Sequence, residues 1–305
     1  MLSPQELQAR ARGLLSFPVT PFTSDNEIDV PRYREHVQFM IDAKPGALFA
    51  CGGTGEFFSL DLDEYRQLVR AAVEQSAGKV PIVAGVGYGT RLACEFAKAA
   101  EDAGADGIMV MPPYLITAEQ EGLYRHYHVI ASTTRLGVIL YQRDNAIFQP
   151  ATVGRLAEIP NVVGFKDGHG EMERLIRIRT VVGDRLLLLN GMPTAELSAQ
   201  AFYGAGCRTY SSAVFNFVPR IARAFFTAIE ADNDAGCQRL LDGFYRPFAD
   251  LRDRVRGFAV ALIKGGLMVT GRSCGGVRPP LIDPTPQQLE ELRAIVERGL
   301  SIVPS

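Results

Sequence analysis

The sequence predicts an α/β protein whose fold is a (β/α)8 barrel, or TIM barrel, with a C-terminal helical extension. Eight short apolar segments recur at nearly regular intervals along the chain. Between successive segments, apolar residues lie three and four positions apart, a spacing typical of amphipathic helices. The segments are continuously apolar, as is typical of parallel strands buried on both faces. Together these observations favour a closed parallel barrel.

Several of the predicted strands follow a glycine that ends the preceding helix, as in DAKPGALFA, DAGADGIMV and FYGAGCRTY. The predicted strands are Leu14–Val19, Ala47–Cys51, Pro81–Gly85, Gly107–Met111, Gly137–Tyr141, Val162–Lys166, Leu186–Asn190 and Arg208–Ser212. The helical pattern between them is clearest at Asp63–Ser76, Leu92–Ala103, Glu119–Ser132 and Glu171–Val181. An open, doubly wound sheet is the alternative, but it should carry a GxGxxG turn after its first strand. This chain reads PVTPFTSDN there, which favours the barrel.

The strand pattern stops after about residue 220. Helical patterns follow at Ala222–Glu230, Ala235–Asp253, Val255–Val269 and Gln287–Glu297, with no flexible linker before them. We therefore expect a barrel over residues 1–220 that carries the active site. Residues 221–305 are expected to form a helical extension packed on that barrel.

Composition excludes several classes of protein. A net charge of −2 and a pI near 6.1 argue against a nucleic-acid-binding protein, which normally has a concentrated basic face. No stretch of about 18 uncharged apolar residues is present, so we expect no membrane span. The N-terminus lacks the apolar core of a secretion signal. The five cysteines are odd in number and form no CxxC pair, as expected for reduced thiols in a cytoplasmic protein.

A lysine ends the apolar run VVGFKDG, which is an unusual place for a cation. A lysine at the end of a strand often extends its ammonium into water along apolar surface. In a barrel, however, side chains at the carboxyl ends of strands surround the active site. If Lys166 faces inward, alternation turns Phe165 and Asp167 toward the helices. The same reasoning predicts that Tyr141 and Asn190, which end their own strands, also face inward at this rim.

Four motifs occur in the order and spacing of a known family. GGTGE at 52–56, MPPY at 111–114, ILY at 139–141 and GFKD at 164–167 resemble motifs of the dihydrodipicolinate synthase and N-acetylneuraminate lyase family. The resemblance covers nearly the whole chain. It implies a barrel that is usually tetrameric, with a Schiff base between Lys166 and a 2-oxo acid. It further implies that Tyr141 relays protons and that Thr54 supports this tyrosine and the substrate carboxylate.

The chain departs from the dihydrodipicolinate synthases at three positions. Gly53 replaces one of two adjacent threonines, Ala146 replaces an arginine, and Leu115 replaces a tyrosine that crosses a subunit interface. GGTGEFFSL, YQRDNA and GFKDGHGE are instead similar to the branch formed by the 5-dehydro-4-deoxyglucarate dehydratases. This resemblance implies dehydration and decarboxylation of a keto sugar diacid. The alternatives are a 2-keto-3-deoxy sugar acid aldolase or another pyruvate-dependent lyase or synthase, and a non-catalytic sensor barrel.

The remaining candidate residues concern substrate binding. We expect Gly53 and Arg143 to hold the two carboxylates, through backbone N–H groups and a guanidinium respectively. The other residues expected to contact the substrate are Asn190, Gly191, Ser211 and Asn216. We expect neither a metal nor a cofactor, because the iminium is itself an electron sink. His126 and His128, two apart on a helix, do not share a face. Loop or packing roles are favoured for Glu56, Asp144, His169 and Lys264.

Overall fold

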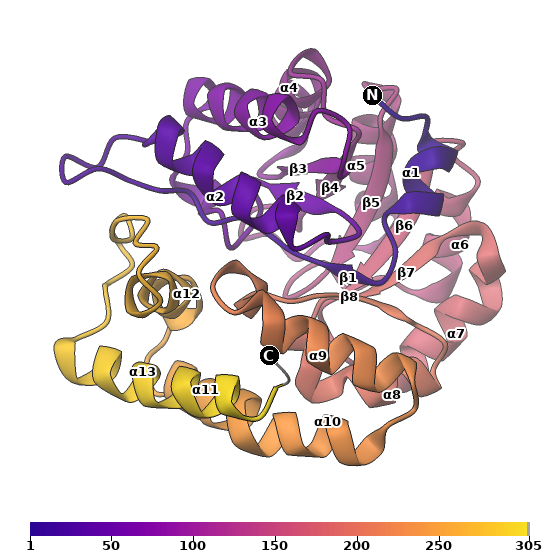
Figure 1. Cartoon of the computed structure of the whole chain (residues 1–305). Helices are drawn as coiled ribbons and strands as arrows, with labels where there is room; N and C mark the ends of the chain where they lie inside the picture. Colours follow the sequence, from indigo (N-terminus) through magenta and orange to yellow (C-terminus); the bar gives the residue numbers. More distant parts are fainter. Residues whose placement is uncertain (304–305) are drawn as a thin grey trace.

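Eight parallel strands form one sheet that closes on itself in the computed structural model, which describes residues 1–303. Figure 1 shows the strands surrounded by helices. Along the sheet the order is β1, β8, β7, β6, β5, β4, β3, β2, and a parallel bridge between Ser16 and Leu48 joins the two end strands. The strands are β1 (Leu14–Leu15), β2 (Leu48–Ala50), β3 (Ile82–Val86), β4 (Gly107–Val110), β5 (Gly137–Gln142), β6 (Val162–Asp167), β7 (Leu187–Asn190) and β8 (Thr209–Ser211). The predicted barrel is confirmed.

The first strand is shorter than predicted. β1 covers Leu14–Leu15, with Ser16 adding the bridge to β2, whereas the apolar run continues to Val19. Pro18 has no amide N–H with which to extend the ladder. Beyond it the backbone N–H of Val19 bonds to the side chain of Asn216 instead of to a strand.

Each strand is followed by a helix of the outer ring. These helices are α2 (Val30–Asp42), α3 (Leu62–Ser76), α4 (Thr90–Asp102), α5 (Gln120–Ser132), α6 (Pro150–Ala157), α7 (Met172–Val182), α8 (Ala199–Gly204) and α9 (Pro219–Glu230). α3 begins with a capping box, in which Asp61 accepts backbone N–H groups and Glu64 reaches back to the amide of Asp61. Tyr65 and Phe96, from α3 and α4, pack edge to face at 4.8 Å between the ring centroids.

A short helix at the N-terminus, α1 (Pro4–Arg10), was not predicted. Its Leu7 is fully buried and belongs to the apolar cluster that fills the barrel. A Cβ on Gly107 or Gly137 would come within 2.3 or 2.8 Å of the Leu7 side chain. Both glycines begin their strands, so α1 covers the amino end of the barrel and leaves the carboxyl end open for a site.

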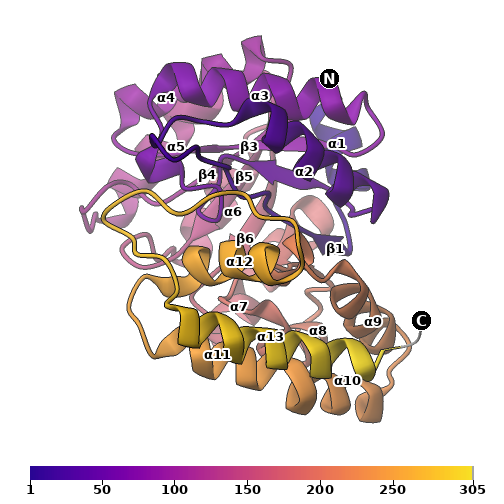
Figure 2. The same cartoon turned by 60° about the vertical axis from the view of Figure 1, so that its left-hand side comes forward.

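The C-terminal helices lie together on one side of the barrel, as both views show (Figures 1 and 2). They are α10 (Asp234–Leu240), a π-helical turn at Leu241–Tyr245, α11 (Arg246–Asp253), α12 (Phe258–Val269) and α13 (Pro286–Ser301). α12 begins later than predicted because Gly257 lies just before it with φ +74°, outside the helical region. Within residues 1–303, no helix combines the length and apolarity needed to cross a membrane.

The eighth strand–helix unit ends with α9. Phe225 and Phe226 of this helix face Tyr210 of β8, with ring centroids 6.5 and 6.1 Å away. A boundary at residue 220 would cut this unit near the start of α9. We therefore propose that the barrel includes α9 and that the helical extension begins with α10.

Candidate active site

Lys166 lies on β6 in register with Tyr141 of β5 and Leu189 of β7. Its side chain is 5% exposed and faces the barrel interior. The ammonium nitrogen Nζ lies 3.8 Å from the ring centroid of Tyr141 and 4.6 Å from that of Phe17. Phe165 points the other way, toward Phe148 on the helical side, with centroids 6.0 Å apart. The alternation along this strand is therefore as predicted.

A cavity of about 790 Å³ opens above Lys166 at the carboxyl ends of the strands. Its walls come from the strand ends on one side and from the C-terminal helices on the other. Of the residues predicted to form the site, the cavity is lined by Gly53, Thr54, Tyr141, Arg143, Lys166, Gly191 and Ser211. Such a volume lies within the range of small-molecule sites.

Burial and neighbouring charges change the acidity of the central pair. Burial lowers the pKa of Lys166; Tyr141 opposes this effect and the Arg143 charge adds to it. Burial alone would raise the pKa of Tyr141, but the positive charges of Lys166 and Arg143 outweigh it and lower this pKa. The amine thus loses its proton more readily than a free lysine, and the phenol exchanges protons more readily than a free tyrosine. These are the properties that a nucleophile and its proton shuttle require.

The Tyr141 hydroxyl contacts two neighbours. It lies 3.5 Å from the carbonyl oxygen of Gly191 and 3.4 Å from Nη1 of Arg143. Thr54 lines the same cavity, yet within residues 1–303 no hydrogen bond joins its hydroxyl to Tyr141. The support that the family resemblance implies for Thr54 is therefore not a direct contact here. Arg143 takes the position beside the phenol.

Gly191 allows a close approach that a larger residue would block. A Cβ at this position would lie 2.7 Å from Cγ of Lys166 and 2.8 Å from its Cε. Its backbone N–H donates to the carbonyl oxygen of Asp167 at 2.7 Å. The absence of a side chain at Gly191 thus leaves the space that the lysine methylenes occupy beside the end of β7.

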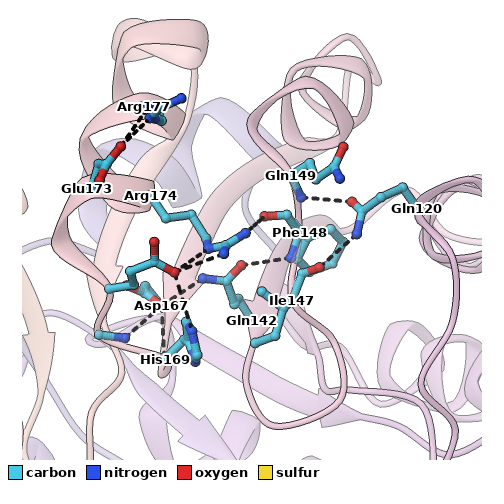
Figure 3. Close-up of polar contacts among 12 residues, drawn as sticks. Gln120, Gln142, Ile147, Phe148, Gln149, Asp167, His169, Glu173, Arg174 and Arg177 are labelled. Atoms are coloured by element: carbon cyan, nitrogen blue, oxygen red, sulfur yellow. Dashed lines mark hydrogen bonds and ion pairs between the residues drawn. The ribbon is translucent and has the colours of Figure 1, made fainter.

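Asp167 is not among the residues that line the cavity, and its side chain lies in a network of hydrogen bonds with the neighbouring loops (Figure 3). Its Oδ1 accepts hydrogen bonds from Gln142 Nε2 at 3.0 Å and from the backbone N–H of His169 at 2.9 Å. Gln142 in turn accepts the backbone N–H of Phe148 at 2.9 Å. This network holds the chain between β5 and α6, which carries Arg143. Asp167 therefore has no direct contact with Lys166 but positions its surroundings.

Asn190 does not face the barrel interior, and this prediction was wrong. It is in register with Asp167 and shares its outward face, because Leu189 takes the inward position beside Lys166. Its Nδ2 donates to the carbonyl oxygen of Ala195, and its Oδ1 accepts the backbone N–H of Met192. Asn190 thus stabilises the turn after β7 instead of contacting a substrate.

Asn216 is likewise not part of the cavity, which corrects its assignment to substrate binding. Its side chain is fully buried. Its Oδ1 accepts the backbone N–H of Val19 at 3.2 Å and lies 2.8 Å from Nε2 of His36. Its Nδ2 donates to the carbonyl oxygens of Phe17 and Ala213, both at 2.9 Å. These bonds use the polar atoms of the amide, and they tie the segment after β1 to the segment after β8.

A buried ion pair fixes the loop that carries Gly53 and Thr54. Glu56 ends this loop in a left-handed conformation with φ 55° and has no exposed surface. Its Oε1 lies 2.7 Å from Nζ of Lys264 on α12, and its Oε2 accepts the backbone N–H of Arg278 at 3.0 Å. Lys264 also donates to the carbonyl oxygen of Gly276. The C-terminal extension thus anchors the loop that carries Gly53 and Thr54.

Replacing Lys264 with methionine should destabilise the protein by about 3–5 kcal/mol, because Glu56 would then be a buried charge without its partner. Urea unfolding of the variant measures this loss. The double variant Glu56→Gln, Lys264→Met should regain much of the stability, since it leaves no uncompensated charge. Lys98→Met, on an exposed part of α4, serves as the control. A single Lys264 variant as stable as the control would contradict a structural role for the pair.

Ser212, which follows Ser211, points away from the cavity into the protein. Its hydroxyl donates to Oε1 of Glu196, and both side chains are buried. Oε2 of Glu196 has no hydrogen-bond partner among the described residues. Burial raises the pKa of Glu196 from its ordinary 4.5 to about 7, and the bond from Ser212 limits that rise.

This carboxyl group should make stability fall as pH rises. Its stabilising effect is complete below the unfolded pKa of 4.5 and disappears as pH rises through the folded pKa of about 7. We therefore expect Glu196→Gln to be as stable as wild type at pH 4 and more stable at pH 8. The difference should be on the order of 3 kcal/mol. Urea unfolding at several pH values measures it, and a difference that does not change between pH 4 and 8 would exclude this interpretation.

The far wall of the cavity was not predicted. It consists of side chains from the C-terminal extension, among them Phe248, Arg252, Arg256 and Phe258. Sequence periodicity placed these residues on helices but could not show that α11 and α12 turn toward the barrel rim. The available signal is DLRDRVRG, where arginines recur at alternate positions just before a glycine.

Comparisons with known proteins show which family the chain resembles over nearly its whole length. The model of the dihydrodipicolinate synthetase family matches residues 10–299. A probable 5-dehydro-4-deoxyglucarate dehydratase 1 from Streptomyces avermitilis is 50% identical over 295 residues, which cover 95% of this chain and 94% of that protein. A probable 5-dehydro-4-deoxyglucarate dehydratase from Rhizobium rhizogenes is 50% identical over 298 residues, with 97% and 98% covered. The crystal structure of dihydrodipicolinate synthase from Oceanobacillus iheyensis matches with a TM-score of 0.90 at 26% identity, covering 98% of this chain and 99% of that one.

Proposed function

The chain belongs to the dihydrodipicolinate synthetase family, and from this premise we propose that it is a decarboxylating 5-dehydro-4-deoxyglucarate dehydratase. Half of its residues are identical to those of proteins named for this activity, over nearly the full length of each. The observation that carries the chemistry is the position of Lys166. Its amine is buried, has a lowered pKa and faces the Tyr141 ring at 3.8 Å inside the cavity.

The reaction begins at the ketone of the substrate. The neutral amine of Lys166 attacks this carbon, and loss of water gives an iminium. The substrate is a six-carbon diacid in which the ketone lies between one carboxylate and a CH₂ group. The iminium withdraws electrons from this CH₂, so Tyr141 can remove one of its protons to leave an enamine. The lowered pKa of the phenol favours this transfer.

Dehydration follows from the enamine. Its electrons expel the hydroxyl group on the next carbon, which leaves as water after taking a proton. The product is an iminium conjugated with a new C=C bond. The protonated Tyr141 is the proposed donor, because one group then serves both transfers. Arg143 lies beside the Tyr141 hydroxyl and stabilises the phenolate that exists between the two proton transfers.

Decarboxylation uses the same electron sink. The distal carboxylate lies on the carbon adjoining the new double bond. When its C–C bond breaks, the electron pair moves through the conjugated system to the nitrogen and CO₂ leaves. A proton added to the carbon beside the imine carbon regenerates the iminium. A second proton, added to the next carbon as the enol loses its O–H proton, gives the aldehyde, and water then hydrolyses the iminium. The products are 2-oxoglutarate semialdehyde, CO₂ and one net water, and the amine of Lys166 is regenerated.

The rest of the cavity is proposed to orient the diacid. The Gly53–Thr54 turn offers backbone N–H groups and a hydroxyl for the carboxylate beside the ketone. A Cβ on Gly53 would meet nothing within 4 Å, so this turn leaves room for a ligand. Gly191 and Ser211 line the remaining strand ends.

Product analysis tests this function. Purified protein is incubated with 5-dehydro-4-deoxyglucarate, and CO₂ and 2-oxoglutarate semialdehyde are measured together. We expect equal amounts of both. Formation of pyruvate and a three-carbon aldehyde acid would instead show an aldolase that uses the same iminium for retro-aldol cleavage. No turnover would leave the sensor barrel as the better description.

We further propose a homotetramer with active sites complete within each subunit, in a cytoplasmic protein. The family resemblance supports the tetramer. Tyr141, Lys166 and the cavity walls come from one chain. The family resemblance implies that Leu115 replaces a tyrosine that crosses a subunit interface. All five cysteines are free, in keeping with a reducing compartment. Light scattering should give a mass near four subunits at micromolar concentration, and a monomer would contradict the proposed assembly.

A further inference from the structure

The cavity holds more positive than negative charge. Its lining contains four cationic side chains, Arg143, Lys166, Arg252 and Arg256, and two acidic ones, Asp144 and Asp253. Both acids are already paired with a neighbouring arginine. Nε of Arg143 lies 3.2 Å from Asp144, and Nε of Arg252 lies 2.7 Å from Asp253. Of the three arginines, Arg256 is therefore the one whose charge no acidic neighbour in the cavity offsets.

The three arginines differ in how many polar partners their guanidinium groups have. Arg143 also contacts the Tyr141 hydroxyl, and Arg252 also donates to the Thr194 hydroxyl. Arg256 has no hydrogen bond, ion pair or aromatic contact in the part of the chain that the structure describes. An exposed guanidinium without a partner, on the wall of a cavity, retains its full capacity to bind an anion.

The turn between α11 and α12 presents Arg256 to the cavity. Gly257 follows it with φ +74° and begins α12 without a capping side chain. The residues of the first turn of α12, Phe258, Ala259 and Val260, also line the cavity. The positive end of the helix dipole therefore adds to the charge of Arg256 on this wall. Lys166, across the cavity on β6, marks where the ketone end of the substrate lies.

We propose that Arg256 binds the distal carboxylate of the substrate and thereby selects diacids over 2-oxo monoacids. This inference rests on the proposed function, because it takes Lys166 as the position of the ketone. Arg143 is then left for the reacting centre beside Tyr141. The barrel supplies the nucleophile, and the C-terminal extension supplies the group that recognises the far end of the substrate.

The kinetic consequence of this role is specific. The distal carboxylate loses its charge as it becomes CO₂, so Arg256 binds the ground state more strongly than the decarboxylation transition state. Such an interaction lowers KM without raising kcat. Replacing Arg256 with glutamine should raise KM for 5-dehydro-4-deoxyglucarate roughly 10- to 100-fold, with kcat no lower than in wild type.

Two probes that can form the Lys166 imine but cannot be dehydrated measure how much the distal carboxylate contributes to binding. 2-Oxoadipate and 2-oxohexanoate have the same six-carbon chain and differ only in the distal carboxylate. Each is titrated against the protein, and the Lys166 imine is trapped with borohydride and counted by mass spectrometry. Wild type should trap the diacid at lower concentration than the monoacid. Arg256→Gln should remove this preference, again by roughly 10- to 100-fold, and leave half-saturation by the monoacid unchanged.

Arg254→Gln is the matched control, because this arginine lies two positions away and pairs with Glu291 at 2.8 Å outside the cavity. It should retain the preference, and Arg256→Lys should retain part of it. A preference that survives Arg256→Gln, an equal loss in Arg254→Gln, or no preference in wild type would overturn the inference. Imine trapping that prefers the diacid, combined with no dehydration, would overturn the proposed function alone.

Discussion

Replacing Lys166 with arginine is expected to lower turnover by at least about 10⁴-fold, because a guanidinium keeps its proton at any working pH and cannot attack a ketone. The native amine is suited to attack because burial lowers its pKa. Steady-state assay of CO₂ release with the keto sugar diacid measures the loss. Retention of a tenth of wild-type activity would exclude Lys166 as the nucleophile.

Two further variants separate chemistry from packing. Arginine is longer than lysine, and Gly191 already approaches the lysine methylenes closely. Lys166→Met removes the amine while keeping a chain of similar volume, so it should be equally inactive and unfold near the wild-type temperature. Lys98→Arg, on an exposed part of α4, should be fully active.

Tyr141→Phe is expected to reduce kcat by about 10²- to 10⁴-fold, the usual contribution of a general acid–base group. The ring would keep its place beside Lys166, and only the hydroxyl that contacts Gly191 and Arg143 would be lost. Imine trapping with 2-oxoadipate should survive better than turnover, since later proton transfers depend most on the phenol.

The matched control is Tyr124→Phe on α5, whose ring contacts Arg155 and does not line the cavity. This variant should have wild-type kcat. Near-normal turnover in a folded Tyr141→Phe variant would show that Tyr141 only lines the cavity and does not transfer protons. Another group would then have to move the protons.

Much of the barrel could be predicted because its strands are buried on both faces and its helices on one. β6 ends at Asp167, one residue beyond the predicted end at Lys166, and β7 ends at Asn190 as predicted. Helix α1 was missed although Ser3 and Glu6 form a capping box at its start, and its packing depends on contacts from Leu7 to glycines far along the chain. Local periodicity carries no signal for such a contact.

The alternation of side chains along each strand correctly predicted that Lys166 and Tyr141 face inward. It failed where the orientation of a residue depends on the register between strands. Tyr141 and Lys166 face each other because they are in register. Asn190 faces outward because the register between β6 and β7 pairs it with Asp167, and sequence alone does not reveal register. The wall that holds Arg256 depends on how α11 and α12 pack across the rim, which is a tertiary property. The distal subsite was therefore beyond sequence-based prediction.

Trapping the intermediate during turnover tests the central claim that one lysine carries both bond-breaking steps. Protein turning over 5-dehydro-4-deoxyglucarate is quenched with borohydride, digested and analysed by mass spectrometry. We predict a reduced adduct on the peptide that contains Lys166, carrying the six-carbon substrate chain or the five-carbon chain left after loss of CO₂. The absence of an adduct, an adduct on another lysine, or a three-carbon adduct on Lys166 would contradict the account.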